Sequence, residues 1–139
     1  MYKKILHGMD GSEGAFKALK EAIDIARLHG AELHSVSVQE VPHYAGTIGE
    51  VMEEEASSKA YFNEIAAGAR EIAQEAGVDL HVHVIVGHEA KTIIEMTKKF
   101  KFDLLVLGFM GRSALYDRVM GSTCQNLVRL APCSVLVVK

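Results

Sequence analysis

The amino-acid sequence predicts an α/β fold, a doubly wound five-stranded parallel sheet in the order 3-2-1-4-5 with helices on both faces. Short apolar runs alternate with stretches in which apolar residues recur every three or four positions, the spacing of one helical face. Such alternation is typical of parallel sheets, and right-handed crossovers leave few strand orders. In this order strands one and four are neighbours, and their carboxyl ends flank the point where such sheets bind ligands. The 139 residues fit a single domain, 1–139.

The first strand is expected from Lys3 to Met9, because this short run is apolar after a polar start. The turn Asp10-Gly11-Ser12 ends it. A helix is expected over 13–28, where Phe16, Leu19, Ile23 and Ala26 share one face. Gly30 then ends the helix.

The second strand is expected around 33–38, with imperfect alternation because helices cover both faces of the sheet. The next stretch, 41–58, is the least regular part of the chain. Pro42, Gly46 and Gly49 interrupt it, and four glutamates make it acidic. Since runs of like charge are usually solvated, we expect a loop here.

A helical stripe runs from Phe62 to Ala76 and leads to a third strand over 79–86. His81 and His83 stand two apart in this strand and therefore point to one face, a geometry that can hold a metal. No third ligand stands at a recognisable spacing. We therefore interpret both histidines as partly exposed strand residues and expect no metal site.

The last third of the chain adds a helix over 90–97 and a strand over 103–107. A final helix is expected to begin near Ser122, where Ser122-x-x-Gln125 matches a capping box. The fifth strand, 134–138, is at a sheet edge and strongly apolar, and exposed edges of this kind favour pairing. We expect a homodimer in which strand five of each chain meets the other, through Val135, Leu136, Val137 and Val138.

A glycine-rich segment follows the fourth strand: Gly108-Phe-Met-Gly111, nine residues, then Gly121-Ser122-Thr123. Loops of this kind bring backbone N–H groups close to phosphate. The segment is neither a P-loop, which needs Lys before its Ser/Thr, nor a GxGxxG turn. Ordinary turns would explain the glycines equally well from spacing alone. Their place beside Asp10 at the switch point favours nucleotide binding.

These residues resemble the universal stress protein family over essentially the whole chain. The glycine segment is similar to the G-x2-G-x9-G-S/T signature of its nucleotide-binding members, and both ends of the chain, 4–12 and 131–138, are similar to the family's ends. The resemblance implies a Rossmann-like sheet of the adenine nucleotide α-hydrolase type, commonly dimeric. It also implies a stress-response regulatory protein that binds ATP or AMP, with Mg²⁺ as a companion of ATP.

The resemblance assigns roles to individual residues. It places Asp10 near the ribose with Met9 beside it, and gives the backbone of Val38 to the adenine edge. Gly8 stands where the family often has Pro, which makes the ribose contact the least secure of these roles. The residues expected around the phosphates are Gly108, Gly111, Gly121, Ser122 and Thr123, with Arg112 as a charge partner. Met110, inside the same segment, is expected to cover the ligand or to pack beneath it.

Composition excludes several other classes of function. The formal charge of −3 provides no basic surface for nucleic acid, and no apolar run approaches the length of a membrane span. Two cysteines make no disulfide framework, which suits a cytoplasmic protein. Two alternatives to a nucleotide-binding regulator stay open: a slow ATP phosphohydrolase and a dimeric interaction module without ligand. Asp10 is the only acidic residue expected near the phosphates and no general base is evident, so enzymatic activity is not expected.

Overall fold

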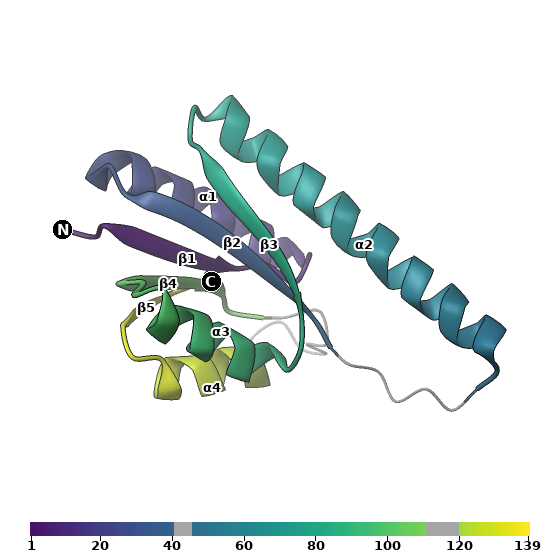
Figure 1. The fold of residues 1–139 in the computed structure, drawn as a ribbon. Coiled ribbons are helices and arrows are strands. Elements are labelled where there is room, and N and C mark those ends of the chain that lie inside the picture. The colour runs from purple at the N-terminus through teal and green to yellow at the C-terminus, as the bar shows by residue number, and fades with distance from the viewer. Residues whose placement is uncertain (41–45, 111–119) are drawn as a thin grey trace.

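A computed structural model describes residues 1–40, 46–110 and 120–139 of the chain. Its sheet has five parallel strands in the order β3-β2-β1-β4-β5, which confirms the predicted fold class and strand order (Figure 1). The strands are β1 Lys4–Gly8, β2 Glu32–Gln39, β3 Leu80–Val86, β4 Leu104–Gly108 and β5 Ser134–Val138.

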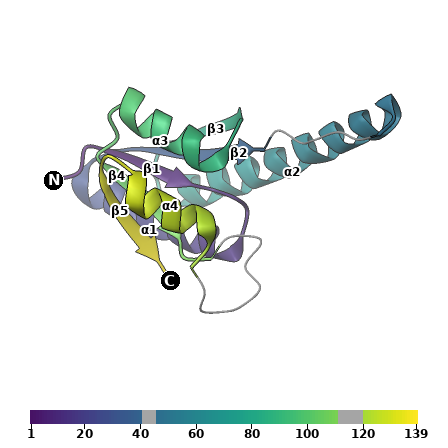
Figure 2. The same ribbon diagram turned by 90° about the horizontal axis from the view of Figure 1, so that it is seen from below.

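Helices cover both faces of this sheet. Two of them, α1 and α2, pack on one face, and α3 and α4 pack on the other (Figures 1 and 2). Their bounds are α1 Glu13–His29, α2 Ile48–Glu75, α3 Glu89–Lys99 and α4 Ser122–Leu130. No helix in the described ranges is both long enough and apolar enough to cross a membrane.

The central strands send alternate side chains into two separate cores. Ile5 faces α1 and α2, whereas the adjacent Leu6 faces α3 and α4. Leu104 and Leu105 of β4 divide in the same way. All four side chains are buried, so β1 and β4 are covered on both faces and read as continuous apolar runs.

Local signals set the ends of α1. The Ser12 hydroxyl accepts a hydrogen bond from the Ala15 N–H at 3.1 Å and so caps the first turn. Gly30 at the other end adopts φ 64°, in the left-handed region that favours glycine. The expected helix over 13–28 thus agrees closely with the observed one.

The expectation of a loop over 41–58 is wrong for its second half, because α2 begins at Ile48. Thr47 and Glu50 form a reciprocal capping box at its start, each side chain 3.2 Å from the other residue's backbone nitrogen. The glutamates follow in the first turns, where the helix dipole favours negative charge. Of the remaining residues, Gly46 and Thr47 precede the helix, and 41–45 lie outside the described residues.

The capping box expected at Ser122 is also wrong. Gly121 is the N-cap of α4 and makes no side-chain cap, while Ser122 is the first helical residue. The Gln125 side chain instead donates from Nε2 to the Met120 carbonyl at 3.0 Å, one turn further back. The Ser122 hydroxyl is therefore not needed to start the helix.

His81 and His83 are partly exposed residues of β3, as expected, and they have partners on β2. The register of β2 and β3 pairs His34 with His81, and the three imidazoles lie together with Glu32. Sequence spacing shows no third ligand because the partners come from a neighbouring strand. Three of these residues, Glu32, His34 and His81, have ligand atoms that lie within 4.8 Å of one another.

His7 of β1 is fully buried beneath α1 and hydrogen-bonded at both ring nitrogens. Nδ1 lies 3.0 Å from the Ser35 hydroxyl, and Nε2 lies 2.9 Å from the Ala15 carbonyl. Burial lowers the pKa of His7 from 6.5 to about 4, although the Ala15 carbonyl and the charge of Asp10 oppose the change. The folded protein therefore keeps this imidazole neutral at pH 7.

Acidification should destabilise the fold through His7. Between pH 6.5 and about 4 the unfolded chain binds a proton that the folded chain does not, so the free energy of unfolding falls as pH falls through this window. The shift corresponds to about 3 kcal/mol. Urea unfolding at a series of pH values should show a smaller fall in His7→Asn than in the wild type.

The matched control is His88→Gln, at an exposed histidine. It should retain the wild-type dependence on pH. An equal fall in His7→Asn and the wild type would show that another group is responsible.

Candidate functional site

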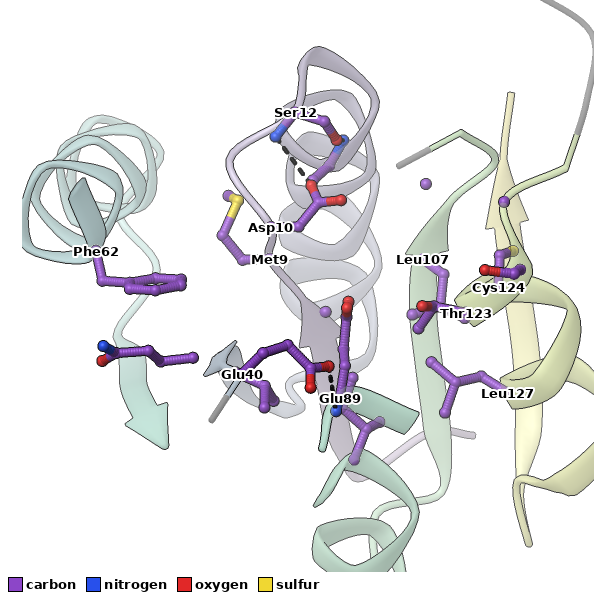
Figure 3. Close-up of a pocket in the computed structure, with 18 of the residues that line it drawn as sticks. Met9, Asp10, Ser12, Glu40, Phe62, Glu89, Leu107, Thr123, Cys124 and Leu127 are labelled. Atoms are coloured by element: carbon purple, nitrogen blue, oxygen red, sulfur yellow. Dashed lines mark hydrogen bonds between the residues drawn. The ribbon is translucent and has the colours of Figure 1, made fainter. Parts of the chain in front are cut away.

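A cleft of about 800 Å³ opens at the carboxyl ends of β1, β2 and β4, between them and the first turn of α4 (Figure 3). This volume lies within the range of small-molecule sites. Its position is the switch point of the sheet, where β1 lies between β2 and β4. Helix α2 adds a further wall through Glu54, Ser57, Ser58, Tyr61 and Phe62.

The structure brings most of the sequence-predicted site residues together in this cleft. They come from three strand ends and one helix N-terminus, although they are up to 114 positions apart in the sequence (123 minus 9). Two others, Gly111 and Arg112, lie outside the described residues. The predicted residues that line the cleft are Met9, Asp10, Val38, Gly108, Met110, Gly121, Ser122 and Thr123.

Asp10 has structural partners as well as a place in the cleft wall. Its Oδ1 accepts a hydrogen bond from the Ser12 N–H at 2.9 Å, and its backbone carbonyl accepts one from the Tyr61 hydroxyl at 2.7 Å. The first bond closes an Asx turn before α1, and the second ties that turn to α2. Asp10 therefore stabilises the turn expected from the sequence and also lines the cleft (Figure 3).

Gly108 is a glycine for reasons of packing. A Cβ atom added there would meet the Gly14 carbonyl carbon at 2.8 Å, the Gly14 oxygen at 2.9 Å and the Ala15 nitrogen at 3.1 Å. These are backbone atoms of the first turn of α1, which cannot swing aside as a side chain can. The close approach of β4 to α1 thus requires glycine whether or not a ligand binds.

Backbone hydrogen bonds hold the start of α4 against the sheet. The Phe109 N–H donates to the Val138 carbonyl at 2.9 Å, and the Gly121 N–H donates to the Phe109 carbonyl at 3.0 Å. The N–H groups of the first helical turn have no acceptor within the helix. They carry the positive end of its dipole, so this wall of the cleft suits an anion.

The cleft contains acidic residues that sequence reasoning missed. Glu40, Glu54 and Glu89 line it with Asp10, and the Glu89 N–H donates to the Glu40 carboxylate at 3.0 Å. Among the lining residues that the structure describes, none is Lys or Arg. The cleft as a whole is thus more acidic than Asp10 alone indicates. Glu40 directly follows β2 and Glu89 begins α3 just after β3, so the rule that parallel strands end at one edge could have located both.

The rest of the lining is apolar. Carbon and sulfur surface in the cleft comes from Met9, Val38, Phe62, Ile93 and Leu107. Phe62 faces the cleft opposite Met9 (Figure 3). The apolar stripe of α2 predicted Phe62 as a core residue and gave no signal for a second role.

Cys124 also lines the cleft, in the first turn of α4. Burial raises the pKa of its thiol, and this effect opposes the thiolate-stabilising dipole of the helix. The side chain is buried against the core of α3 and α4. It is therefore a packing residue.

Comparison with known proteins agrees with this arrangement. The model of the universal stress protein family matches residues 1–139. The chain belongs to the universal stress protein family. A universal stress protein of Methanocaldococcus jannaschii is 33% identical over 147 residues, covering 100% of this chain and 83% of that protein.

Solved structures of universal stress proteins have the same fold. One from Lactobacillus plantarum superposes with a TM-score of 0.86 at 29% identity, covering 99% of this chain and 98% of the other. A second, solved in complex with cAMP, superposes with a TM-score of 0.78 at 27% identity, covering 99% and 97%. Nucleotide binding thus occurs within the family of this universal stress protein.

Gly108→Ala should destabilise the universal stress protein fold. Its methyl group has to displace the backbone of α1, and overpacking of this kind typically costs about 1–3 kcal/mol. Chemical denaturation measures the loss. Gly68→Ala is the matched control, because its Cβ would meet the Phe16 ring at an ordinary 3.6 Å and Ala favours the helix. Equal stability of Gly108→Ala and the wild type would contradict the packing role.

Proposed function

We propose that this protein is a regulatory binding protein for an adenine nucleotide, held in the cleft between the ends of β1, β2 and β4 and the N-terminus of α4. The observation that carries the proposal is the combination in one cleft of apolar surface and an anion-favouring helix start. The cAMP complex of a relative 27% identical supports it.

In this proposal the base lies on the apolar surface of the cleft. The backbone of Val38, at the end of β2, meets the adenine edge, and Met9 covers part of the nucleoside. Asp10 accepts a hydrogen bond from the ribose. The phosphates lie at the first turn of α4, against the backbone of Gly121, Ser122 and Thr123.

The four acidic residues of the cleft affect which phosphorylation state of the nucleotide binds best. Asp10, Glu40, Glu54 and Glu89 repel a polyphosphate unless positive charge accompanies it. Mg²⁺ bound to ATP would supply that charge, as would Arg112, whose role as a charge partner stays a prediction. AMP brings less negative charge and needs less compensation.

Slow ATP hydrolysis is a second candidate function, favoured by the same four carboxylates, since one of them could orient water or hold a metal. Their hydrogen bonds weaken this candidate. Asp10 serves a turn and Glu40 serves the start of α3. Binding without turnover therefore has the better support.

Ser122→Glu should abolish nucleotide binding while leaving the fold intact. The helix dipole stabilises a carboxylate in the first turn of α4, but the carboxylate repels phosphate. Ser122→Gln adds the same bulk without the charge and should retain most of the affinity. Isothermal titration with AMP and with ATP and Mg²⁺ measures both variants, and denaturation curves check that each is folded.

Two results would contradict this proposal. One is wild-type affinity in Ser122→Glu, which would move the phosphates away from α4. The other is wild-type protein that binds neither AMP nor ATP. Steady release of ADP in the titrated samples would instead favour the phosphohydrolase.

We also propose that the protein forms a homodimer through β5. This strand is an edge of the sheet and pairs only with β4 among the described strands. Its side chains Val135, Leu136, Val137 and Val138 remain partly exposed. The Val138 carbonyl accepts a hydrogen bond from the N–H of Phe109, which follows β4, and so points toward the interior of the sheet. Since backbone groups alternate along a strand, those of Val135 and Val137 point to the open edge.

Val137→Pro should convert the dimer to a monomer without unfolding the chain. Proline removes the outward N–H of residue 137 and leaves the inward hydrogen bonds to β4 in place. Val137→Ala, which keeps the N–H, is the matched control and should remain dimeric. Sedimentation equilibrium measures both variants. A wild type that sediments only as a monomer at micromolar concentration, or a dimeric Val137→Pro, would overturn the proposal.

A further inference from the structure

Glu32, His34, His81 and His83 form a polar cluster on the α3 and α4 face of the sheet, where β2 and β3 begin. All four point to one face, because Glu32 and His34 are two apart, His81 and His83 are two apart, and His34 pairs with His81 across the strands. The nucleotide cleft lies at the opposite ends of these strands. His34 and Val38 are four positions apart on β2, about 13 Å along the strand.

Three side chains of the cluster place metal-binding atoms close together. His34 Nε2 and the Glu32 carboxylate are 2.7 Å apart, and with His81 the three ligand atoms lie within 4.8 Å of one another. Two ligands of a tetrahedral zinc ion, each about 2.0–2.1 Å from the metal, lie about 3.3 Å apart. The observed separations bracket that value. Small side-chain rotations therefore suffice to form the site.

We propose that Glu32, His34 and His81 bind a divalent transition-metal ion of the Zn²⁺ class. Two imidazoles and one carboxylate are a donor set that suits Zn²⁺. The ion takes the place of the hydrogen bond between His34 Nε2 and the Glu32 carboxylate. The side chains of Glu32 and His81 are about half exposed, at 49% and 45%, so the ion is reached directly from solvent.

His83 is the positioning residue of this site. Its Nε2 lies 2.8 Å from His34 Nδ1, and the two rings are parallel within 1°. When the metal occupies His34 Nε2, the Nδ1 of that ring carries the proton and donates a hydrogen bond to His83 Nε2. A ligating histidine almost always has such a partner, which fixes its tautomer and the orientation of its ring.

Packing holds the central ligand in place. The His34 ring lies edge-on against the buried Phe102 with centroids 5.0 Å apart, and its side chain is only 12% exposed. The exposed His81 ring stacks on it, with centroids 4.5 Å apart and an angle of 24° between the rings. Asp79 lies 3.8 Å from His81 and adds negative charge beside the site.

Lys4 is a cation whose charge acts on Glu32. Its ammonium donates to the Phe100 carbonyl at 2.9 Å and lies over the Phe102 ring at 4.9 Å. These contacts hold its charge on the side of Phe100. The carboxylates of Glu32 and Asp79 offset its repulsion of a metal ion.

The test is titration of the whole, tag-free chain with Zn²⁺, followed by calorimetry and by the histidine ring signals in NMR spectra. We expect one Zn²⁺ per chain at this cluster, with the signals of His34, His81 and His83 shifting together. His34→Gln and His81→Gln should abolish this binding step. His83→Gln should weaken it by about tenfold or more, the usual effect of losing a partner of a ligating histidine.

Two control variants locate the ion. His88→Gln removes an exposed histidine outside the cluster, and Glu40→Gln removes a carboxylate of the nucleotide cleft. Both should bind Zn²⁺ as the wild type does. Substitution with Co²⁺ should show no thiolate-to-metal charge-transfer band, which excludes Cys124 and Cys133 as ligands.

Three results would overturn the proposal. The wild type could fail to bind Zn²⁺, or His34→Gln could bind it unchanged. Binding could also depend on Glu40 or on a thiol instead of the histidine cluster. None of these outcomes would bear on nucleotide binding, which the Ser122 variants test at the other end of the sheet.

Discussion

The pairing of β1 with β4 is the interaction on which the rest of the structure depends. It places two strands side by side that are a hundred residues apart in sequence, with Ile5 opposite Leu104 and His7 opposite Val106. Both strands are buried on both faces, so neither can slip without exposing apolar side chains to water. Their carboxyl ends diverge into the turn before α1 and the segment after Gly108. The cleft exists because those two exits lie next to each other.

The same pairing explains why small residues are needed at the carboxyl ends of β1 and β4. β4 approaches α1 so closely that Gly108 lies against the backbone of Gly14. Gly8 is less strictly confined, since an added Cβ would meet at 2.9 Å only the Leu107 side chain, which can move. A glycine pattern that resembles a ligand-binding signature thus has a packing component. Backbone contacts of the phosphates in the proposed complex would share these positions with the helix–sheet contact.

The sequence predicted the fold well because its signals are local and repeated. Periodic apolar residues located the helices that pack on the sheet, and the alternation of strand and helix determined the strand order. The start of α2 was missed because its first turns pack on nothing: Ile48 is 81% exposed and Met52 is 64% exposed. Ile48, Val51 and Met52 do recur at helical spacing, but Gly49 and the run of glutamates obscure this short pattern. The capping pair Thr47 and Glu50 is the second local sign of the helix start.

The candidate site was predicted in part for a similar reason. Residues at the ends of strands, such as Asp10 and Gly108, could be placed by topology. Glu54 and Tyr61 could not, because they reach the cleft from α2, whose path over the sheet is a tertiary property. The histidine cluster was missed because it depends on the register between β2 and β3, which pairs His34 with His81. No spacing within one strand encodes that register.

The free end of α2 has a mechanical consequence. Phe62 is the first buried residue of the helix and Tyr61 beside it packs on the core, so residues 48–60 project beyond the core, with the tip about 21 Å from Phe62 (Figure 1). This projecting segment would move as a rigid body that pivots about Phe62. A tilt of about 10° would displace its tip by nearly 4 Å, whereas Ser57 and Ser58, close to Phe62, would move by less than half of that. A small displacement of α2 where it lines the cleft would thus produce a larger displacement at its exposed start, near Ile48.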